Sequence, residues 1–142
     1  MIYGPGQSLD RLIPITIMNC LGNKSFNCSS GKQLRNFLYV NDFSKIVYKS
    51  LFLKTNGEIL NVGSSKNYKV KFIINKINKL IKKGSPQYGL IKLRKDEPLN
   101  LYPSLNKLKR FIILNKETNI ETGLKKTISY YKNPNYEKNL FS

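Results

Sequence analysis

Arg35 is the residue of this chain best suited to hold an anion in a fixed direction. It is one of four arginines in a sequence that carries twenty-one lysines. It lies in residues 34–40, where apolar and polar residues roughly alternate, as in a half-buried strand. A guanidinium held by a strand can bind a phosphate or diphosphate through two parallel hydrogen bonds. Arg35 is therefore a candidate diphosphate ligand, and the alternative is an ordinary exposed arginine on a sheet face.

Other elements must close this strand and support it. Asp42 is expected at the N-cap of a helix over 42–51, because apolar residues follow it at helical spacing. Further helices are expected at 14–21, 69–83 and 120–132, with a short one at 104–109 capped by Ser104. Strands are expected at 25–28, 59–62 and 90–93, the first in a hairpin with the Arg35 strand. The pattern predicts an α/β fold, a small lobe of short β elements with about four helices.

Three of the expected helices have recognisable inward faces. The helix at 69–83 carries one apolar stripe, made by Val70, Ile73, Ile74, Ile77, Leu80 and Ile81. The helix at 120–132 is expected to direct Ile120, Leu124, Ile128 and Tyr131 inward. In the helix at 14–21, Pro14 fits the first helical position, and Ile15, Met18 and Leu21 are expected to face the core before Gly22 ends it.

Length and charge limit the classes of function. A chain of 142 residues is one domain by length, and its net charge of +17 would suit a nucleic-acid binder. The excess is nearly all lysine, and it comes with seventeen asparagines and fifteen isoleucines. All three are residues of AT-rich codons, so genome composition is the preferred cause of the charge. The alternative, a basic nucleic-acid-binding domain, would use Phe37 and Tyr39 beside Arg35 on an exposed sheet face.

Cysteine and histidine usage limits the chemistry further. The chain has no histidine, and Cys20 and Cys28 are its only cysteines. Histidine acid–base catalysis is excluded, and two cysteines are too few for a zinc cluster, so no metal site is expected. We expect buried or idle thiols in a reducing cytosol.

No signal peptide is seen, and the longest apolar run, 12–18, is broken by Pro14 and too short to span a membrane. A cytoplasmic location is expected.

Five motifs in order give the chain a family resemblance. Residues 31–42, GKQLRNFLYVND, resemble the G-x-Q-x-R-D-F-x-Y-V-x-D signature of extended short-chain dehydrogenase/reductases that act on nucleotide sugars. These are the NAD-dependent epimerases and dehydratases, UDP-glucose 4-epimerase among them. Similar to other motifs of the family are the segments 3–7 (YGPGQ), 59–64 (ILNVGS), 94–98 (RKDEP) and 121–128 (ETGLKKTI). One departure is Asn36, where the family usually has aspartate beside the arginine.

The resemblance covers only the C-terminal, substrate-binding part of such an enzyme, residues 1–132, with a frayed tail expected at 133–142. It implies that Arg35 and Arg94 hold the diphosphate of a nucleotide sugar from two sides. It places Leu21, Phe26 and Asn27 beside the nucleotide base. Epimerisation, dehydration and reduction at C4 of the sugar all stay open.

The same resemblance implies what this chain lacks. The NAD(P) of an intact relative sits in a Rossmann half, and the Ser/Thr and Tyr-x-x-x-Lys catalytic residues precede the Tyr3-Gly4-Pro5 turn. No catalytic residue and no cofactor are therefore expected in this chain. It is expected to pair with a separate Rossmann-domain chain or to be a truncated, non-functional fragment. An apolar face should then be exposed around Tyr3, Pro14 and Phe37.

Overall fold

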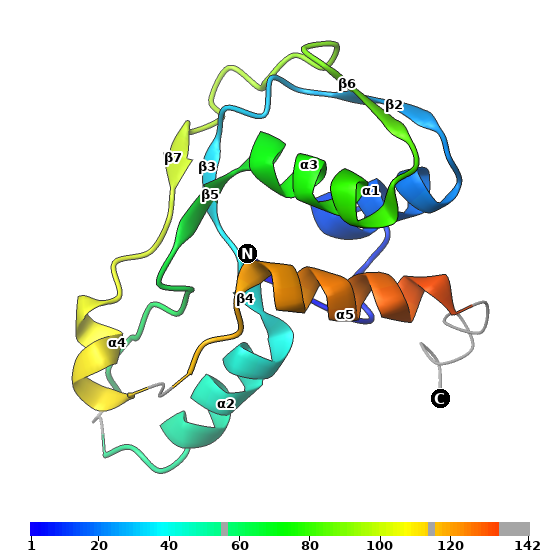
Figure 1. Ribbon diagram of the computed structural model, residues 1–142. Coiled ribbons are helices and arrows are strands. Elements are labelled where there is room, and N and C mark those ends of the chain that lie inside the picture. Colours follow the sequence, from blue (N-terminus) through cyan, green and yellow to red (C-terminus); the bar gives the residue numbers. More distant parts are fainter. Residues whose placement is uncertain (55–56, 114–115, 134–142) are drawn as a thin grey trace.

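Five helices and seven short strands form the part of the chain that the structure describes, residues 1–54, 57–113 and 116–133 (Figure 1). The structure is a computed structural model. Its elements in chain order are β1 (Ile2–Tyr3), α1 (Leu12–Leu21), β2 (Ser25–Cys28), β3 (Leu34–Asn36), β4 (Leu38–Tyr39), α2 (Val40–Ser50), β5 (Asn67–Lys69), α3 (Val70–Ile81), β6 (Ser85–Tyr88), β7 (Asn100–Leu101), α4 (Asn106–Phe111) and α5 (Ile120–Lys132). The expected small α/β fold is confirmed. The tail expected at 133–142 falls almost wholly outside the described residues.

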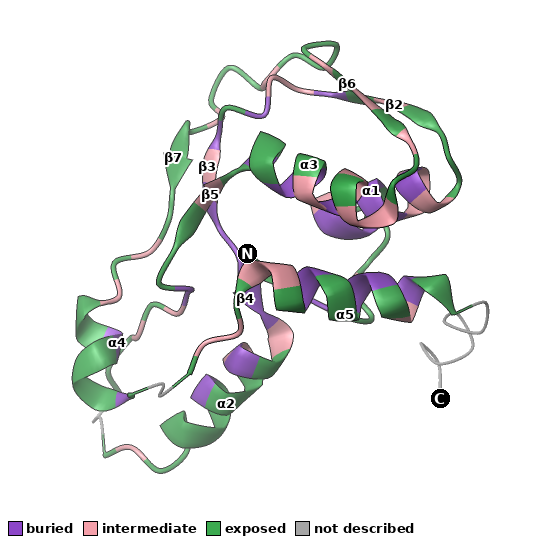
Figure 2. Cartoon of the chain, in the orientation of Figure 1, coloured by how far each residue is buried: buried purple, intermediate pink, exposed green. Residues whose placement is uncertain are grey.

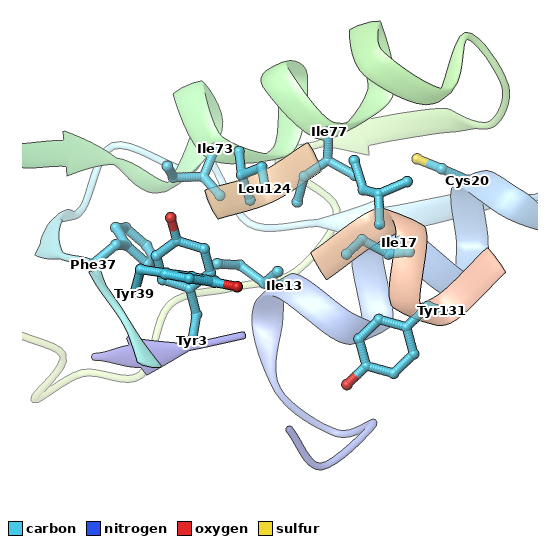
Figure 3. Close-up of a cluster of buried hydrophobic side chains, with 11 residues drawn as sticks. Tyr3, Ile13, Ile17, Cys20, Phe37, Tyr39, Ile73, Ile77, Leu124 and Tyr131 are labelled. Atoms are coloured by element: carbon cyan, nitrogen blue, oxygen red, sulfur yellow. The ribbon is translucent and has the colours of Figure 1, made fainter. Parts of the chain in front are cut away.

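The main core lies between α1, α3 and α5 (Figures 1 and 3). Its buried members are Tyr3, Ile13, Ile17, Cys20, Phe37, Tyr39, Ile73, Ile77, Leu124, Ile128 and Tyr131. Each fully buried aliphatic side chain contributes roughly 1.5–3 kcal/mol of transfer free energy. The stripe predicted on α3 is buried, with Ile73 and Ile77 in this core and Val70 and Ile74 in a smaller cluster with Cys28. The inward face predicted on α5 belongs to the main core, so both predictions are confirmed.

The side of α1 that faces the core is not the one predicted. The helix begins at Leu12, two residues earlier than expected, and Pro14 is its third residue. Proline is still tolerated there, because N–H groups in the first turn have no carbonyl partner within the helix. Ile15 is 46% exposed, whereas Ile13 and Ile17 are 2% and 0% exposed. Met18 and Leu21 only flank the core.

The strands form three small sheets. β1 pairs with β4 and β2 with β6, both in parallel, while β3 is the centre of a three-stranded sheet between antiparallel β5 and parallel β7. The single strand expected over 34–40 is therefore interrupted at Phe37, and its halves join different sheets. The hairpin expected between 25–28 and the Arg35 strand is wrong, because β2 pairs with β6 instead. The segments 59–62 and 90–93 are not strands.

A second core joins α2 to α4 through Leu38, Ile46, Leu108 and Ile112. The N-cap of α2 is Tyr39, not Asp42, and Leu105 rather than Ser104 precedes α4. Asp42 lies in the first turn of α2 with 1% of its surface exposed. Its carboxylate accepts from the backbone N–H of Thr118 at 2.7 Å and from Lys45 Nζ at 3.3 Å. The carboxylate therefore ties the start of α2 to the segment that leads into α5.

The exposed apolar surface lies only partly where the sequence predicted it. Tyr3, Pro14 and Phe37 are themselves buried, but Ile2 and Ile15 beside them are 41% and 46% exposed. Large apolar side chains are also exposed at the end of α2, which is green in Figure 2. We call the following residues the α2 apolar end: Val47, Tyr48, Leu51 and Phe52, which are 42%, 64%, 74% and 70% exposed. Among the described residues, no helix combines the length and apolar character needed to cross a membrane.

Glu121 links α3 to α5 and gives the fold a predicted acid dependence. Hydrogen bonds from Lys125 and Lys76, with Nζ at 2.8 and 2.5 Å, lower the pKa of Glu121 from 4.5 to about 2. A lowered pKa in the folded state means that this stabilisation is present above pH 4.5 and is lost as the pH falls towards 2. The contribution is small, because the pair is exposed.

We therefore expect Glu121→Gln to make the free energy of unfolding depend less steeply on pH in the acid range. Urea unfolding between pH 2 and 5 should show a shallower loss of stability for the variant than for the natural protein. Identical slopes for the two proteins would contradict the assignment.

Candidate anion site on the central strand β3

Arg35 is enclosed by protein rather than open to solvent. It lies on β3, the central strand of its sheet, and is 6% exposed. Its Nη1 donates to the carbonyls of Leu34 and Leu99 at 2.9 and 3.4 Å. Its Nη2 donates to the carboxylate of Glu97, in an ion pair where the glutamate side chain is 29% exposed. The strand thus fixes the guanidinium as expected, but protein acceptors already satisfy it.

The turn at 94–97 carries both Arg94 and Glu97. The N–H of Glu97 donates to the carbonyl of Arg94 at 3.1 Å, and the next residues lead into β7, which pairs with β3. Arg94 is exposed. The fold therefore brings a turn that carries the second arginine to the sheet of the first. Whether both side chains grip one diphosphate stays a prediction.

Asn36 has a different role from the one its place in the motif suggested. It is 3% exposed, and its side chain is directed to the 64–67 loop, away from the Glu97 ion pair. Its Oδ1 accepts from the N–H of Ser64 at 2.7 Å, and its Nδ2 donates to Ser64 O and Asn67 Oδ1 at 2.8 and 2.7 Å. Both ends of the amide are used, so an asparagine fits this position better than a carboxylate would.

The loop that Asn36 holds also forms one wall of a pocket. A Cβ on Gly63 would lie 2.6 Å from Asn36 Oδ1 and from Pro103 Cγ, so this position requires glycine. Glu117 accepts from the hydroxyl of Ser64 and, at 3.0 Å, from the N–H of Ser65. The mostly apolar pocket between this loop and α4 measures about 300 Å³. No local pattern pointed to Glu117, because its partners are fifty-two and fifty-three residues away along the chain.

The residues expected near a nucleotide base lie on other elements. Phe26 and Asn27 are on β2, where they pair with Pro86 and Gln87 of β6, and Leu21 ends α1. Leu21 and Phe26 pack against the main core, while Asn27 is exposed. Residues 29–33 join β2 to the Arg35 strand. Contact of these three residues with a base stays a prediction.

The cysteines are buried, and so are the two aromatic residues beside Arg35. Cys20 and Cys28 are buried free thiols, as expected, and burial raises the pKa of both. In the described ranges, no cluster of metal-ligating side chains is present. Phe37 and Tyr39 are 3% and 4% exposed, so the exposed aromatic face that a nucleic-acid binder would need is not formed by them.

Comparison with known proteins finds both a matching family and individual relatives. Residues 1–63 match the sequence profile of the NAD dependent epimerase/dehydratase family. A probable dTDP-glucose 4,6-dehydratase of Sinorhizobium fredii is 30% identical over 137 residues, covering 91% of this chain and 39% of that protein. A dTDP-glucose 4,6-dehydratase of Escherichia coli is also 30% identical, over 92% of this chain and 40% of its own length. The chain thus spans about two-fifths of the length of these curated relatives.

The fold is also shared with a solved structure. An epimerase from Methanothermobacter thermautotrophicus has a TM-score of 0.84 at 21% identity, covering 96% of this chain and 42% of that one. The match in fold extends over nearly the whole chain, as do the matches in sequence. The chain is thus similar in sequence to members of the NAD-dependent epimerase/dehydratase family over about two-fifths of their length, consistent with the C-terminal part of an extended short-chain dehydrogenase/reductase.

Proposed function

We propose that residues 1–132 form the nucleotide-sugar-binding part of an NAD-dependent sugar epimerase, dehydratase or reductase. The observation that carries this proposal is the guanidinium of Arg35, fixed on a central strand beside a turn that carries Arg94. A planar fork on a rigid strand suits the two oxygens of a diphosphate. The names of the curated relatives support a nucleotide-sugar substrate, since one is a dTDP-glucose 4,6-dehydratase and the other a probable one.

In this proposal each candidate residue has a distinct role. Arg35 and Arg94 hold the diphosphate, while Leu21, Phe26 and Asn27 lie beside the nucleotide base. The segment Arg94-Lys95-Asp96-Glu97-Pro98 favours a dehydratase or reductase over an epimerase. The sugar and the base are left open.

The proposal assigns catalysis to a partner. NAD(P) and the catalytic tyrosine would come from a Rossmann-fold part, which another segment or a separate cytosolic chain supplies. The α2 apolar end is the surface that such a part would cover, since four large apolar side chains are exposed there. On its own the chain would bind substrate and not turn it over.

Replacing Arg35 or Arg94 with lysine should weaken the binding of dTDP-glucose by about 1–3 kcal/mol, the range for a charged hydrogen bond. The change keeps the net charge of +17 but removes the two-donor fork. Titration calorimetry on the purified chain is the measurement.

Arg110→Lys is the matched control, because Arg110 is an exposed arginine on α4. Its replacement should leave the affinity unchanged. Equal, small losses in all three variants, with an affinity that falls steeply with salt, would instead support a nucleic-acid-type binder held by diffuse charge.

A further inference from the structure

Glu97 holds the position on Arg35 that a ligand oxygen would need. The Nη2 of Arg35 donates to the Glu97 carboxylate, and Nη1 is already shared between two backbone carbonyls. The Glu97 side chain is 29% exposed and that of Arg35 only 8%, so the carboxylate is the solvent-side member of the pair. A ligand approaching Arg35 from solvent therefore meets a negative charge first.

The partners of Arg35 differ in how easily they can be exchanged. Leu34 O belongs to β3 itself, and Leu99 O also accepts the N–H of Leu34 at 2.7 Å, next to the β3–β7 ladder. Displacing either carbonyl would disturb the sheet. Glu97 is attached only through a side chain on the 94–97 turn, so it can rotate away at the cost of one ion pair. Glu97 is thus the exchangeable partner.

We propose that Glu97 is a built-in competitor that sets the anion selectivity of Arg35. Carboxylate and phosphate oxygens suit the same donors of a guanidinium, so a ligand must replace a full negative charge to enter. A diphosphate brings more than one charge and can do so with a net gain. A singly charged phosphodiester only exchanges one ion pair for another. This proposal rests on the proposed diphosphate site at Arg35.

The test measures UDP binding to the full chain by titration calorimetry. Glu97→Gln should bind UDP about tenfold more tightly than the natural protein, because a neutral amide competes poorly for the guanidinium. Its preference for UDP over cyclic UMP, a singly charged phosphodiester, should become smaller. Adding Arg35→Lys to Glu97→Gln should remove the gain.

Asp96→Asn is the matched control. It removes one negative charge from the neighbouring, exposed position of the same turn, so a general electrostatic effect would appear in both variants. We expect it to change the affinity by less than about threefold, because exposed charges are screened. Glu97→Asp, which keeps the charge and shortens the reach, should give a smaller gain than Glu97→Gln.

The outcomes separate the two proposals. An affinity for UDP that is unchanged or lower in both Glu97 variants overturns the competitor role and leaves the diphosphate site intact. UDP binding that is absent, or that does not depend on Arg35, in every variant overturns both.

Discussion

Replacing Ile17 with alanine is expected to lower the free energy of unfolding by about 2–5 kcal/mol, the range for truncating a buried aliphatic side chain. Ile17 is 0% exposed and belongs to the core between α1, α3 and α5, as Figure 3 shows. The variant loses apolar burial and leaves a cavity that three helices must share. Urea unfolding followed by circular dichroism measures the loss.

Ile15→Ala is the matched control on the same helix. The chemical change is identical, but Ile15 is 46% exposed. We expect a loss of less than about 1 kcal/mol, as for surface substitutions. Equal losses in the two variants would mean that α1 presents a different face to the core from the one described.

Asn36→Asp is expected to destabilise the protein by about 2–4 kcal/mol, although aspartate is the residue that related motifs usually carry. The Nδ2 of Asn36 donates to Ser64 O and to Asn67 Oδ1, and a carboxylate cannot donate to either. Two acceptors would then face a buried negative charge. Ser64 N would keep its acceptor, so the 63–65 loop should loosen rather than detach completely.

The control for this prediction is Asn27→Asp, the same chemical change at an exposed residue of β2. Its effect should lie within about 0.5 kcal/mol. Urea unfolding at pH 7 compares the two variants. A tolerated Asn36→Asp would show that the loop rearranges to supply donors, and the role given to the amide would then be wrong.

The helices were predictable from sequence because their signal is local. The apolar stripe of α3 repeats at helical spacing within a single segment, and Gly84 follows its end. The buried side of α1 was predicted wrongly, because Pro14 was taken to mark the start of the helix and the inward stripe was counted from Ile15, whereas Ile13 and Ile17 are the buried residues. Ile15 is two residues from each of them, about 200° around the helix, and so points away from the core.

Strand pairing was less predictable, since it depends on segments far apart. β2 reads as a strand, but its partner β6 lies sixty residues later in register, and the nearer β3 was the simpler choice. The partners of Arg35 were unpredictable for the same reason, since they too are distant in the sequence. Arg35 itself could be singled out by its residue type and motif, whereas its ion pair with Glu97 spans sixty-two residues and depends on the 94–97 turn. No local pattern contains that information.

The last described helix completes a core that the first residues begin. Tyr131 Oη donates to the carbonyl of Gln7 at 2.6 Å across 124 positions, and Leu124 and Ile128 pack in the same cluster as Ile13. During synthesis, therefore, the apolar side chains of α1 and α3 that contact α5 stay uncovered until α5 has left the ribosome. Non-local closure of this kind slows folding and exposes the nascent chain to aggregation. A stop codon before residue 120 would thus give a chaperone-dependent, aggregating product rather than a shorter version of the same domain.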